Sequence, residues 1–167
     1  MSVEAFNEVY RRYAKDVYRF ALWLTGRPEE AEEVVAETFI RVWTRWQRVR
    51  TETVKGYILA IARSVVRERG RRHRPEEPLD PATVDQQATP EEVSAQRSEL
   101  GVVLAALREL PAVDREVFAL TVVEELPYAE IARIMEISLS AAKVRVHRIR
   151  IKLAAKRLGG TRDETHA

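Results

Sequence analysis

The sequence contains no cysteine, and its glycines are few. The absence of cysteine excludes disulfides, thiolate metal sites, thiol nucleophiles and iron–sulfur clusters, and it permits a reducing compartment. None of the six glycines belongs to a glycine-rich loop of the kind that cradles phosphates. Long apolar runs are missing at the start, because residues 1–15 carry charges every few positions, unlike a signal peptide or a membrane span. We therefore expect a cytoplasmic protein without membrane insertion.

The net charge of +2 conceals an uneven distribution of charge along the chain. Between Ile137 and Arg162 there are many lysines and arginines and no acidic residue, and a second basic run covers residues 67–74. Acids collect elsewhere, at residues 29–33 and 75–94. Basic blocks of this kind attract phosphates, so DNA is the expected partner. For the shorter run, solvated surface at a domain edge is an open alternative.

Apolar residues recur at steps of three and four through the first part of the chain, which predicts amphipathic helices. The expected helices cover residues 6–24, 28–46 and 54–74. Gly26 separates the first two, and Pro28 suits the first turn of a helix because its missing N–H needs no partner there. On the third helix the residues expected to be buried are Ile58, Ile61, Ala62 and Val65.

Residues 75–94 contain prolines, several acids and few large apolar side chains, which predicts a tether. The chain then divides into a domain of residues 1–74, a linker of residues 75–94, a domain of residues 95–160 and a tail of residues 161–167. Within the linker, Thr89 begins a helix-start pattern of hydroxyl, proline and carboxylate. No alternating strand pattern and no repeat of solenoid spacing is present, so the predicted fold is all-α, with two small helical domains.

Residues 128–158 combine a short helix, a tight turn and a longer helix, which is the layout of a helix-turn-helix. Pro111 and Pro127 precede the two helices that lead into it. Ser138 is expected to cap the long helix, which should end near Gly159 and Gly160.

Within the long helix, apolar and basic residues separate onto different faces. The apolar positions expected to pack inward are Leu139, Ala142, Val146, Ile149 and Leu153. Lys143, His147 and Arg150 lie on another face. In such a helix, side chains near the start reach base edges in the major groove, and basic side chains further along hold the phosphate backbone.

The chain resembles the extracytoplasmic-function (ECF) group of bacterial RNA polymerase sigma factors in three blocks, which follow the family's order and spacing. These blocks are AEEVVAETFIRVW, the arginine-rich third helix, and LPAVDREVFALTVVEELPYAEIARIMEISLSAAKVRVHRIRIKL. The resemblance covers nearly the whole chain. It implies sigma regions 2 and 4, which bind core RNA polymerase and read the −10 and −35 promoter elements. It implies no enzymatic activity, no catalytic residue, no cofactor and no metal, and an anti-sigma factor as a controlling partner.

The resemblance also implies roles for single residues. The residues that would dock on the clamp helices of the polymerase's largest subunit are Glu33, Glu37 and Arg41. The residues implied at the −10 element are Tyr57, Arg63, Arg67, Arg71 and Arg72. The residues implied at bases of the −35 element are Lys143, Val144, His147 and Arg148, with Ser140, Arg145 and Arg150 suited to phosphates. From the sequence alone, Glu33 and Glu37 are equally a solvated carboxylate pair, and Tyr57 is equally a core residue.

The chain departs from the family's pattern at a few positions. Ala36 replaces a frequent glutamine, which takes it out of the contact set. Glu136 stands at the usual glycine of the helix-turn-helix turn, so we expect a turn without a left-handed residue there. Ala141 or Val144 occupies a position that is commonly threonine or serine. These departures predict an altered promoter preference.

Two other functions compete with this interpretation. The first is a helix-turn-helix regulator that binds duplex DNA without core polymerase, with the first domain used for dimerisation or effector binding. The second is a carboxylate metalloenzyme built on the glutamates of the second helix, which needs histidines at helical spacing. His73, His147 and His166 are scattered, which disfavours it. The acidic linker is either a strand that threads the polymerase's RNA channel or a solvated tether.

Overall fold

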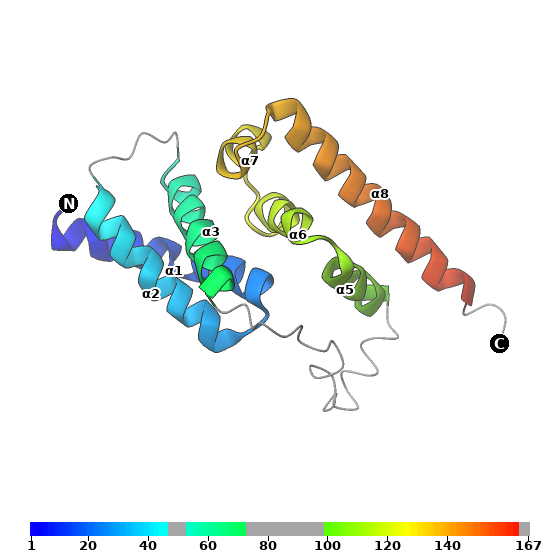
Figure 1. Ribbon diagram of the computed structural model, residues 1–167, viewed down its shortest axis with the longest axis horizontal. Helices are drawn as coiled ribbons and strands as arrows, with labels where there is room; N and C mark the ends of the chain where they lie inside the picture. Colours follow the sequence, from blue (N-terminus) through cyan, green and yellow to red (C-terminus); the bar gives the residue numbers. More distant parts are fainter. Residues whose placement is uncertain (47–52, 73–98, 164–167) are drawn as a thin grey trace.

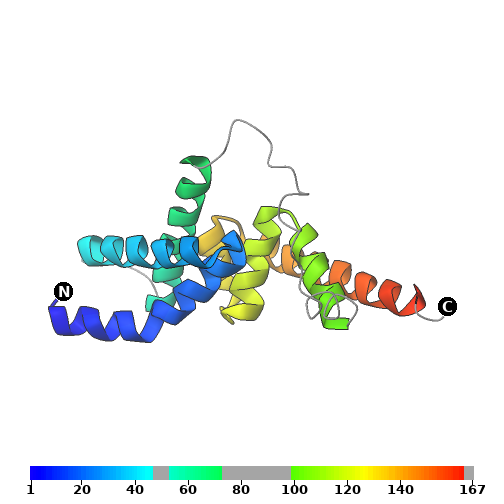
Figure 2. The same ribbon diagram turned by 90° about the horizontal axis from the view of Figure 1, so that it is seen from below.

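The computed structural model describes residues 1–46, 53–72 and 99–163, and within these ranges every regular element is a helix (Figure 1). The all-α prediction is confirmed. Two groups of helices, which we call the first and the second unit, pack against each other (Figures 1 and 2). The first unit comprises α1 (Val3–Thr25), α2 (Pro28–Arg45) and α3 (Val54–Arg72). The second comprises α5 (Glu99–Glu109), α6 (Ala112–Phe118), the π-helix η3 (Ala119–Val123), α7 (Tyr128–Met135) and α8 (Leu139–Asp163).

The helix ends of the first unit follow from local chemistry that the sequence shows. The Ser2 hydroxyl accepts a hydrogen bond from the Ala5 N–H at 3.1 Å and caps α1. Gly26 ends α1 in the left-handed region, at a φ of 68°, and its N–H donates to the Leu22 carbonyl. Pro28 opens α2 at the first helical position, as predicted.

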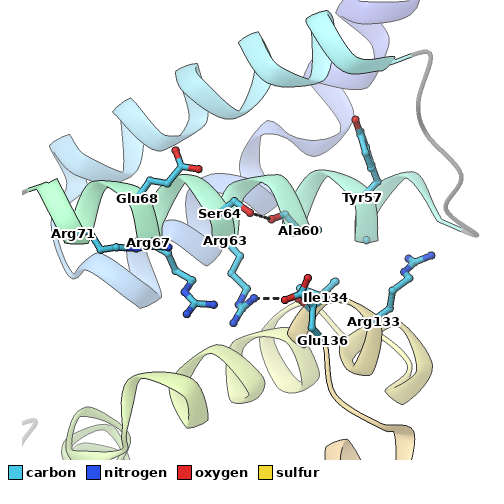
Figure 3. Close-up of a pocket in the computed structure, with 11 residues that line it drawn as sticks. Tyr57, Ala60, Arg63, Ser64, Arg67, Glu68, Arg71, Arg133, Ile134 and Glu136 are labelled. Carbon is cyan, nitrogen blue, oxygen red and sulfur yellow. Dashed lines mark hydrogen bonds between the residues drawn. The ribbon is translucent and has the colours of Figure 1, made fainter.

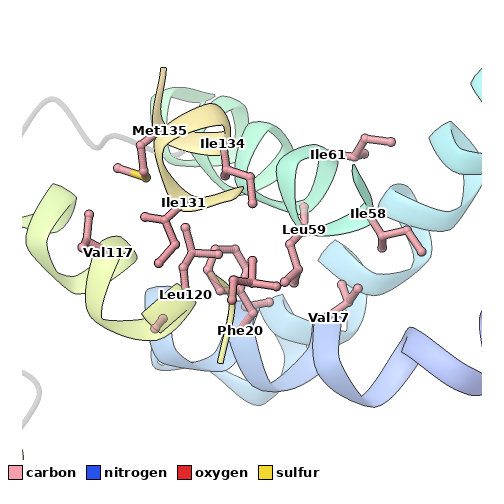
Figure 4. Close-up of a cluster of buried hydrophobic side chains, with 14 of the residues drawn as sticks. Val17, Phe20, Ile58, Leu59, Ile61, Val117, Leu120, Ile131, Ile134 and Met135 are labelled. Atoms are coloured by element: carbon pink, nitrogen blue, oxygen red, sulfur yellow. The ribbon is translucent and has the colours of Figure 1, made fainter. Parts of the chain in front are cut away.

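The buried face of α3 is wider than the sequence predicted. The four expected residues are buried, and Leu59 is fully buried beside them. Ile58 faces α1 and α2, whereas Leu59 lies toward the second unit (Figure 4). Helix α3 packs against α1 and α2 on one side and against α7 on another. It therefore buries a wider face than the single stripe of an amphipathic helix, which explains why Leu59 is buried.

Glu99 is the first described residue of the second unit. The predicted helix start at Thr89 therefore lies outside the described residues. Pro111 and Pro127 precede α6 and α7, as expected. Helix α6 ends at Phe118 and is followed directly by the π-helix η3. After the last turn of η3, the Glu124 N–H donates to the Ala119 carbonyl, five residues back.

Three expectations for the helix-turn-helix were wrong. Leu139 is 45% exposed, because it is the first residue of α8 and the period of the helix interior does not fix its direction at the turn. The helix continues through Gly159 and Gly160 to Asp163, since neither glycine takes a positive φ. Glu136 does adopt the left-handed conformation, at φ 57° and ψ 42°. The Ile137 N–H donates to the Ala132 carbonyl across it, as in a glycine-type C-cap.

Other expectations for α8 are confirmed. The Ser138 hydroxyl accepts a hydrogen bond from the Ala141 N–H at 3.0 Å and caps the helix. Ala142, Val146 and Ile149 are buried, and Leu153 is partly buried.

The two units share one hydrophobic core. Helix α3 packs against α7, and α1 packs against α6 and η3. Large buried side chains from both units meet in this cluster, among them Phe20, Leu59, Leu120 and Ile131 (Figure 4). The rings of Trp23 and Phe118 lie beside it, with centroids 5.7 Å apart. Burial of these apolar surfaces stabilises the contact between the units.

Candidate nucleic-acid interface

The basic face of α8 is open to solvent. The Lys143, His147 and Arg148 side chains are exposed, and so are Ser140 and Arg150. Val144 is 47% exposed in the middle of this face, although it is apolar. An apolar side chain among bases in the major groove suits the methyl group of thymine. The first two turns of α8 therefore present the donors and the apolar contact that reading of base edges requires.

Arg145, the remaining residue predicted for this face, is held by its own unit. Its guanidinium donates a hydrogen bond to the Asp114 carboxylate of α6 at 2.8 Å. Lys152 lies 3.9 Å from the second oxygen of the same carboxylate. These two cations fasten α8 to α6. For the predicted phosphate contact, the Arg145 guanidinium must either bind a phosphate and Asp114 at the same time or release Asp114.

The arginines of α3 divide into exposed and sequestered residues. Arg67, Arg71 and Arg72 are exposed. Only 11% of the Arg63 side chain is accessible, because its Nε donates to Glu116 of α6 at 2.7 Å. Its Nη1 donates to the Ile134 carbonyl of α7 at 3.2 Å. Figure 3 shows Arg63 and Arg67 extending from α3 toward the second unit.

A cavity of about 340 Å³ lies between α3 and α7 (Figure 3). Its lining is rich in guanidinium groups and includes Tyr57, Arg63, Arg67, Arg71, Arg133 and Glu136. The Tyr57 hydroxyl donates to the Arg45 carbonyl at 3.4 Å, and burial raises the pKa of this phenol. Four of the five residues predicted for the −10 element thus gather around one space, while Arg72 lies outside it.

The three residues predicted for polymerase binding form one ionic network on α2. Arg41 donates to Glu37 at 2.6 Å, one helical turn away. Arg69 of α3 pairs with both Glu33 and Glu37. Arg41 also donates to Glu68 of α3 at 2.6 Å. This hydrogen bond lowers the pKa of Glu68 and raises that of Arg41.

Sequence reasoning missed several residues of this surface. It assigned the whole basic run on α3 to DNA or solvent, whereas Arg69 turns toward α2. The sequence feature that could have indicated this contact is Glu68, the single acid within the basic run, which pairs with Arg41 of α2. Two apolar side chains on α2 are also exposed: Ile40 is 64% exposed and Trp43 is 44% exposed. Exposed apolar residues beside charged ones are typical of protein-binding surfaces.

Across residues 1–46, 53–72 and 99–163, no three side chains of the types His, Cys, Asp and Glu stand close enough to share a metal ion. In those same ranges, no helix is long and apolar enough to cross a membrane.

Comparisons with known proteins agree with the two units. Residues 9–76 match the Sigma-70 region 2 family, and residues 100–153 match the Sigma-70, region 4 family. The chain is 32% identical over 162 residues to the ECF RNA polymerase sigma factor SigM of Bacillus subtilis, covering 95% of this chain and 98% of SigM. The chain belongs to the ECF RNA polymerase sigma factors. This membership favours the sigma-factor interpretation over a regulator that acts alone.

Other ECF sigma factors match over most of this chain. SigE of Mycolicibacterium smegmatis is 33% identical over 157 residues, which are 91% of this chain and 61% of SigE. Two solved structures share the fold at 22% identity and 92% coverage of this chain. RpoE, in complex with the anti-sigma factor NepR from Bartonella quintana, has a TM-score of 0.66 and is covered to 97%. CnrH, in complex with the cytosolic domain of CnrY, has a TM-score of 0.68 and is covered to 88%.

Proposed function

We propose that this ECF sigma factor binds core RNA polymerase and directs initiation at promoters by reading the −35 element with α8 and the −10 element with α3. The observation that carries the proposal is the pair of basic helix faces, one in each sigma region. The proposed role needs no catalytic group of its own, and it places the protein in the cytoplasm with the polymerase.

The contacts proposed for α8 separate into two kinds. Lys143, Val144, His147 and Arg148 lie on the exposed face of the first turns and read bases. Ser140 and Arg150, at the two ends of this face, hold phosphates, and so does Arg145 once Asp114 releases it. Base contacts give sequence preference, and phosphate contacts give affinity for any duplex.

The contacts proposed for α3 suit a single strand. Tyr57 lines the edge of the cavity, its ring extends from α3 away from the second unit (Figure 3), and an unstacked base can pack on such a ring. Arg63, Arg67, Arg71 and Arg72 provide cations for the adjoining phosphates. The −10 element is read after strand separation in this proposal, which agrees with a site made of an aromatic side chain and guanidinium groups.

The polymerase surface proposed here is centred on α2. Glu33, Glu37 and Arg41 meet the clamp helices of the largest subunit, and the exposed Ile40 adds apolar area beside them. Replacing Ile40 with alanine is expected to weaken polymerase binding about tenfold in a fluorescence titration. The control is Val3→Ala, which truncates an apolar side chain of similar exposure on a different helix, α1. Equal affinities for the two variants would move the polymerase surface elsewhere.

An anti-sigma factor is the proposed controlling partner. RpoE and CnrH, which share this fold, were each solved with a bound protein partner. A tagged version of this chain is expected to capture a small protein inhibitor as well as polymerase subunits from its host. Repeated capture of polymerase subunits alone would remove the inhibitor from the proposal.

A selection on DNA tests the proposed function as a whole. Fragmented genomic DNA of the source organism is incubated with the chain alone, with core polymerase alone and with both, and the retained fragments are sequenced. We expect a shared pair of spaced motifs only in the mixture. The same motifs retained by the chain alone would support the stand-alone regulator instead.

A further inference from the structure

Two rows of basic side chains run along α8, one on each side of its exposed face. The members of a row are three or four residues apart, so they lie one turn after another on the same side of the helix. The first row consists of Lys143, His147 and Arg150, and the second of Arg145, Arg148 and Lys152. A helix in the major groove has a phosphate strand on either side, so each row faces one strand.

The two rows differ in their ion pairs. Among the residues that the structure describes, no carboxylate pairs with the first row, whereas Asp114 of α6 pairs with the second. Arg145 Nη1 donates to one Asp114 oxygen at 2.8 Å, and Lys152 Nζ lies 3.9 Å from the other oxygen. Arg148, between these two cations in the row, is exposed. One carboxylate therefore engages two of the three cations in the second row.

The carboxylate is fixed, whereas its two cations can move. Asp114 lies in the first turn of α6, and only 11% of its side chain is accessible. The Arg145 and Lys152 side chains are 41% and 58% accessible. A carboxylate that is nearly buried is strongly unfavourable without a cation, so Asp114 needs one of them at all times. Either cation can meet this need, which leaves the other available to DNA.

A phosphate on this side of α8 meets a guanidinium that is already bound to an anion. If Arg145 held both, the phosphate and the Asp114 carboxylate would lie close together and repel each other. The separation between Lys152 and Asp114 is about 1 Å longer than a charge-assisted hydrogen bond. The flexible four-carbon stem and rotatable ammonium group of lysine can close this gap. Lys152 is therefore placed to replace Arg145 on Asp114.

We propose that Asp114 is a positioning residue: it holds Arg145 in the unbound protein and exchanges it for Lys152 when a duplex phosphate binds the guanidinium. The first row is available to any duplex, whereas the phosphate contact of Arg145 is made only at the cost of this exchange. Asp114 thereby lowers the affinity of α8 for DNA. The proposal rests on the proposed function in placing α8 in a DNA groove.

The test begins with the charge of Asp114. Asp114→Asn keeps the shape of the side chain and removes its charge. The matched control is Glu109→Gln on α5, because Glu109 also pairs with a cation of α8, Lys156, at 3.3 Å. Both substitutions raise the net charge by one and remove an ion pair between α8 and a neighbouring helix. A difference between them therefore reports the release of Arg145.

The measured quantity is the affinity of the full chain for a labelled duplex of about 30 base pairs and mixed sequence, over a range of salt concentrations. Phosphate contacts need no particular promoter sequence. Asp114→Asn should tighten binding about three- to tenfold more than the control does. This gain should vanish when Arg145 is also replaced by alanine. Arg145→Ala alone should weaken binding and reduce the salt dependence by about one phosphate contact.

A second pair of variants tests the exchange with Asp114 in place. Lys152→Ala leaves Asp114 without a substitute cation, so it should weaken duplex binding about threefold. In an Arg145→Ala chain no exchange takes place, so Lys152→Ala should have no further effect. A lysine that contacts phosphate directly would weaken binding in both chains, which would contradict the exchange. These variants keep the Asp114 carboxylate, so this test does not depend on the folding of Asp114→Asn.

Two further results would overturn the inference. One is a folded Asp114→Asn chain, verified by circular dichroism, that binds the duplex no more tightly than Glu109→Gln. The other is an equal gain from Asp114→Asn with alanine at position 145, which would reduce the effect to net charge. The proposed function fails separately, if Arg150→Ala leaves duplex binding and its salt dependence unchanged, because α8 would then not lie on DNA.

Discussion

Arg19 and Glu124 stand 105 residues apart in the chain, and the guanidinium of one donates two hydrogen bonds to the carboxylate of the other. The Glu124 side chain is fully buried, whereas 45% of the Arg19 side chain is accessible. The pair therefore connects the two sigma regions through a carboxylate that is shielded from solvent. Such a carboxylate needs its cations, because an unpaired buried charge is strongly unfavourable.

Removal of Arg19 should lower the free energy of unfolding. Arg19→Ala leaves Lys55 as a partner of Glu124, so we expect a loss of about 1.5 to 3 kcal/mol, the range for a hydrogen bond to a charged group. Urea unfolding measures the change. Arg11→Ala, which replaces an exposed arginine on the same helix, is the control and should change the free energy little. Equal effects of the two substitutions would contradict the importance of the pair.

The Glu68–Arg41 hydrogen bond predicts a dependence of stability on pH. The bond lowers the pKa of Glu68 from its ordinary value of 4.5, so the folded carboxylate binds its proton less tightly than the unfolded one. The stabilisation is complete above pH 4.5 and is lost as the pH falls through the folded pKa. Glu68→Gln should therefore flatten the acid side of the stability curve. Glu32→Gln, at an exposed position of α2, serves as the control, and an unchanged acid side in Glu68→Gln would refute the prediction.

Glycine should be the better residue at position 136. The left-handed backbone of Glu136 is unfavourable for a residue with a Cβ, so Glu136→Gly should raise the free energy of unfolding by about 1 kcal/mol. The matched control, Glu32→Gly, places the same change within α2 and should lower it by about 1 kcal/mol. Thermal or urea unfolding distinguishes the two signs. A loss of stability at position 136 would mean that the carboxylate has a structural partner.

Variants of α8 should separate base contacts from phosphate contacts. Lys143→Ala and His147→Ala are expected to weaken −35 recognition by about 1 to 3 kcal/mol at some promoter sequences and by little at others. Arg150→Ala should weaken all sequences alike and reduce the dependence of binding on salt. A panel of −35 sequences, bound by the holoenzyme at two salt concentrations, measures both. The same pattern for all three variants would overturn the assignment.

The sequence predicted helix ends correctly where interactions within a single turn determine them. Gly26, Pro28 and Ser138 act over a single turn, and each has its predicted role. The exposed face of α8 followed from helical period alone for the same reason. The left-handed Glu136 was not predicted, because propensity disfavours it and only the packing of the helix-turn-helix imposes it.

The contact between the units was beyond sequence reasoning. Glu116 lies on the short helix α6 and Glu124 directly follows η3, and at such positions a solvated acid is the usual interpretation. Their burial depends on partners more than fifty residues away, Arg63 and Arg19. The roles of Glu33 and Glu37 came from the family resemblance, and their ionic network with Arg69 depends on how α2 and α3 pack.

The most direct test of the account is run-off transcription by core polymerase on fragmented genomic DNA of the source organism, with and without this protein. New transcript starts are expected only when the protein is added, each preceded by the same two spaced motifs. Lys143→Ala is expected to change which of these starts are used. A core polymerase that produces the same starts with and without the protein would contradict the account.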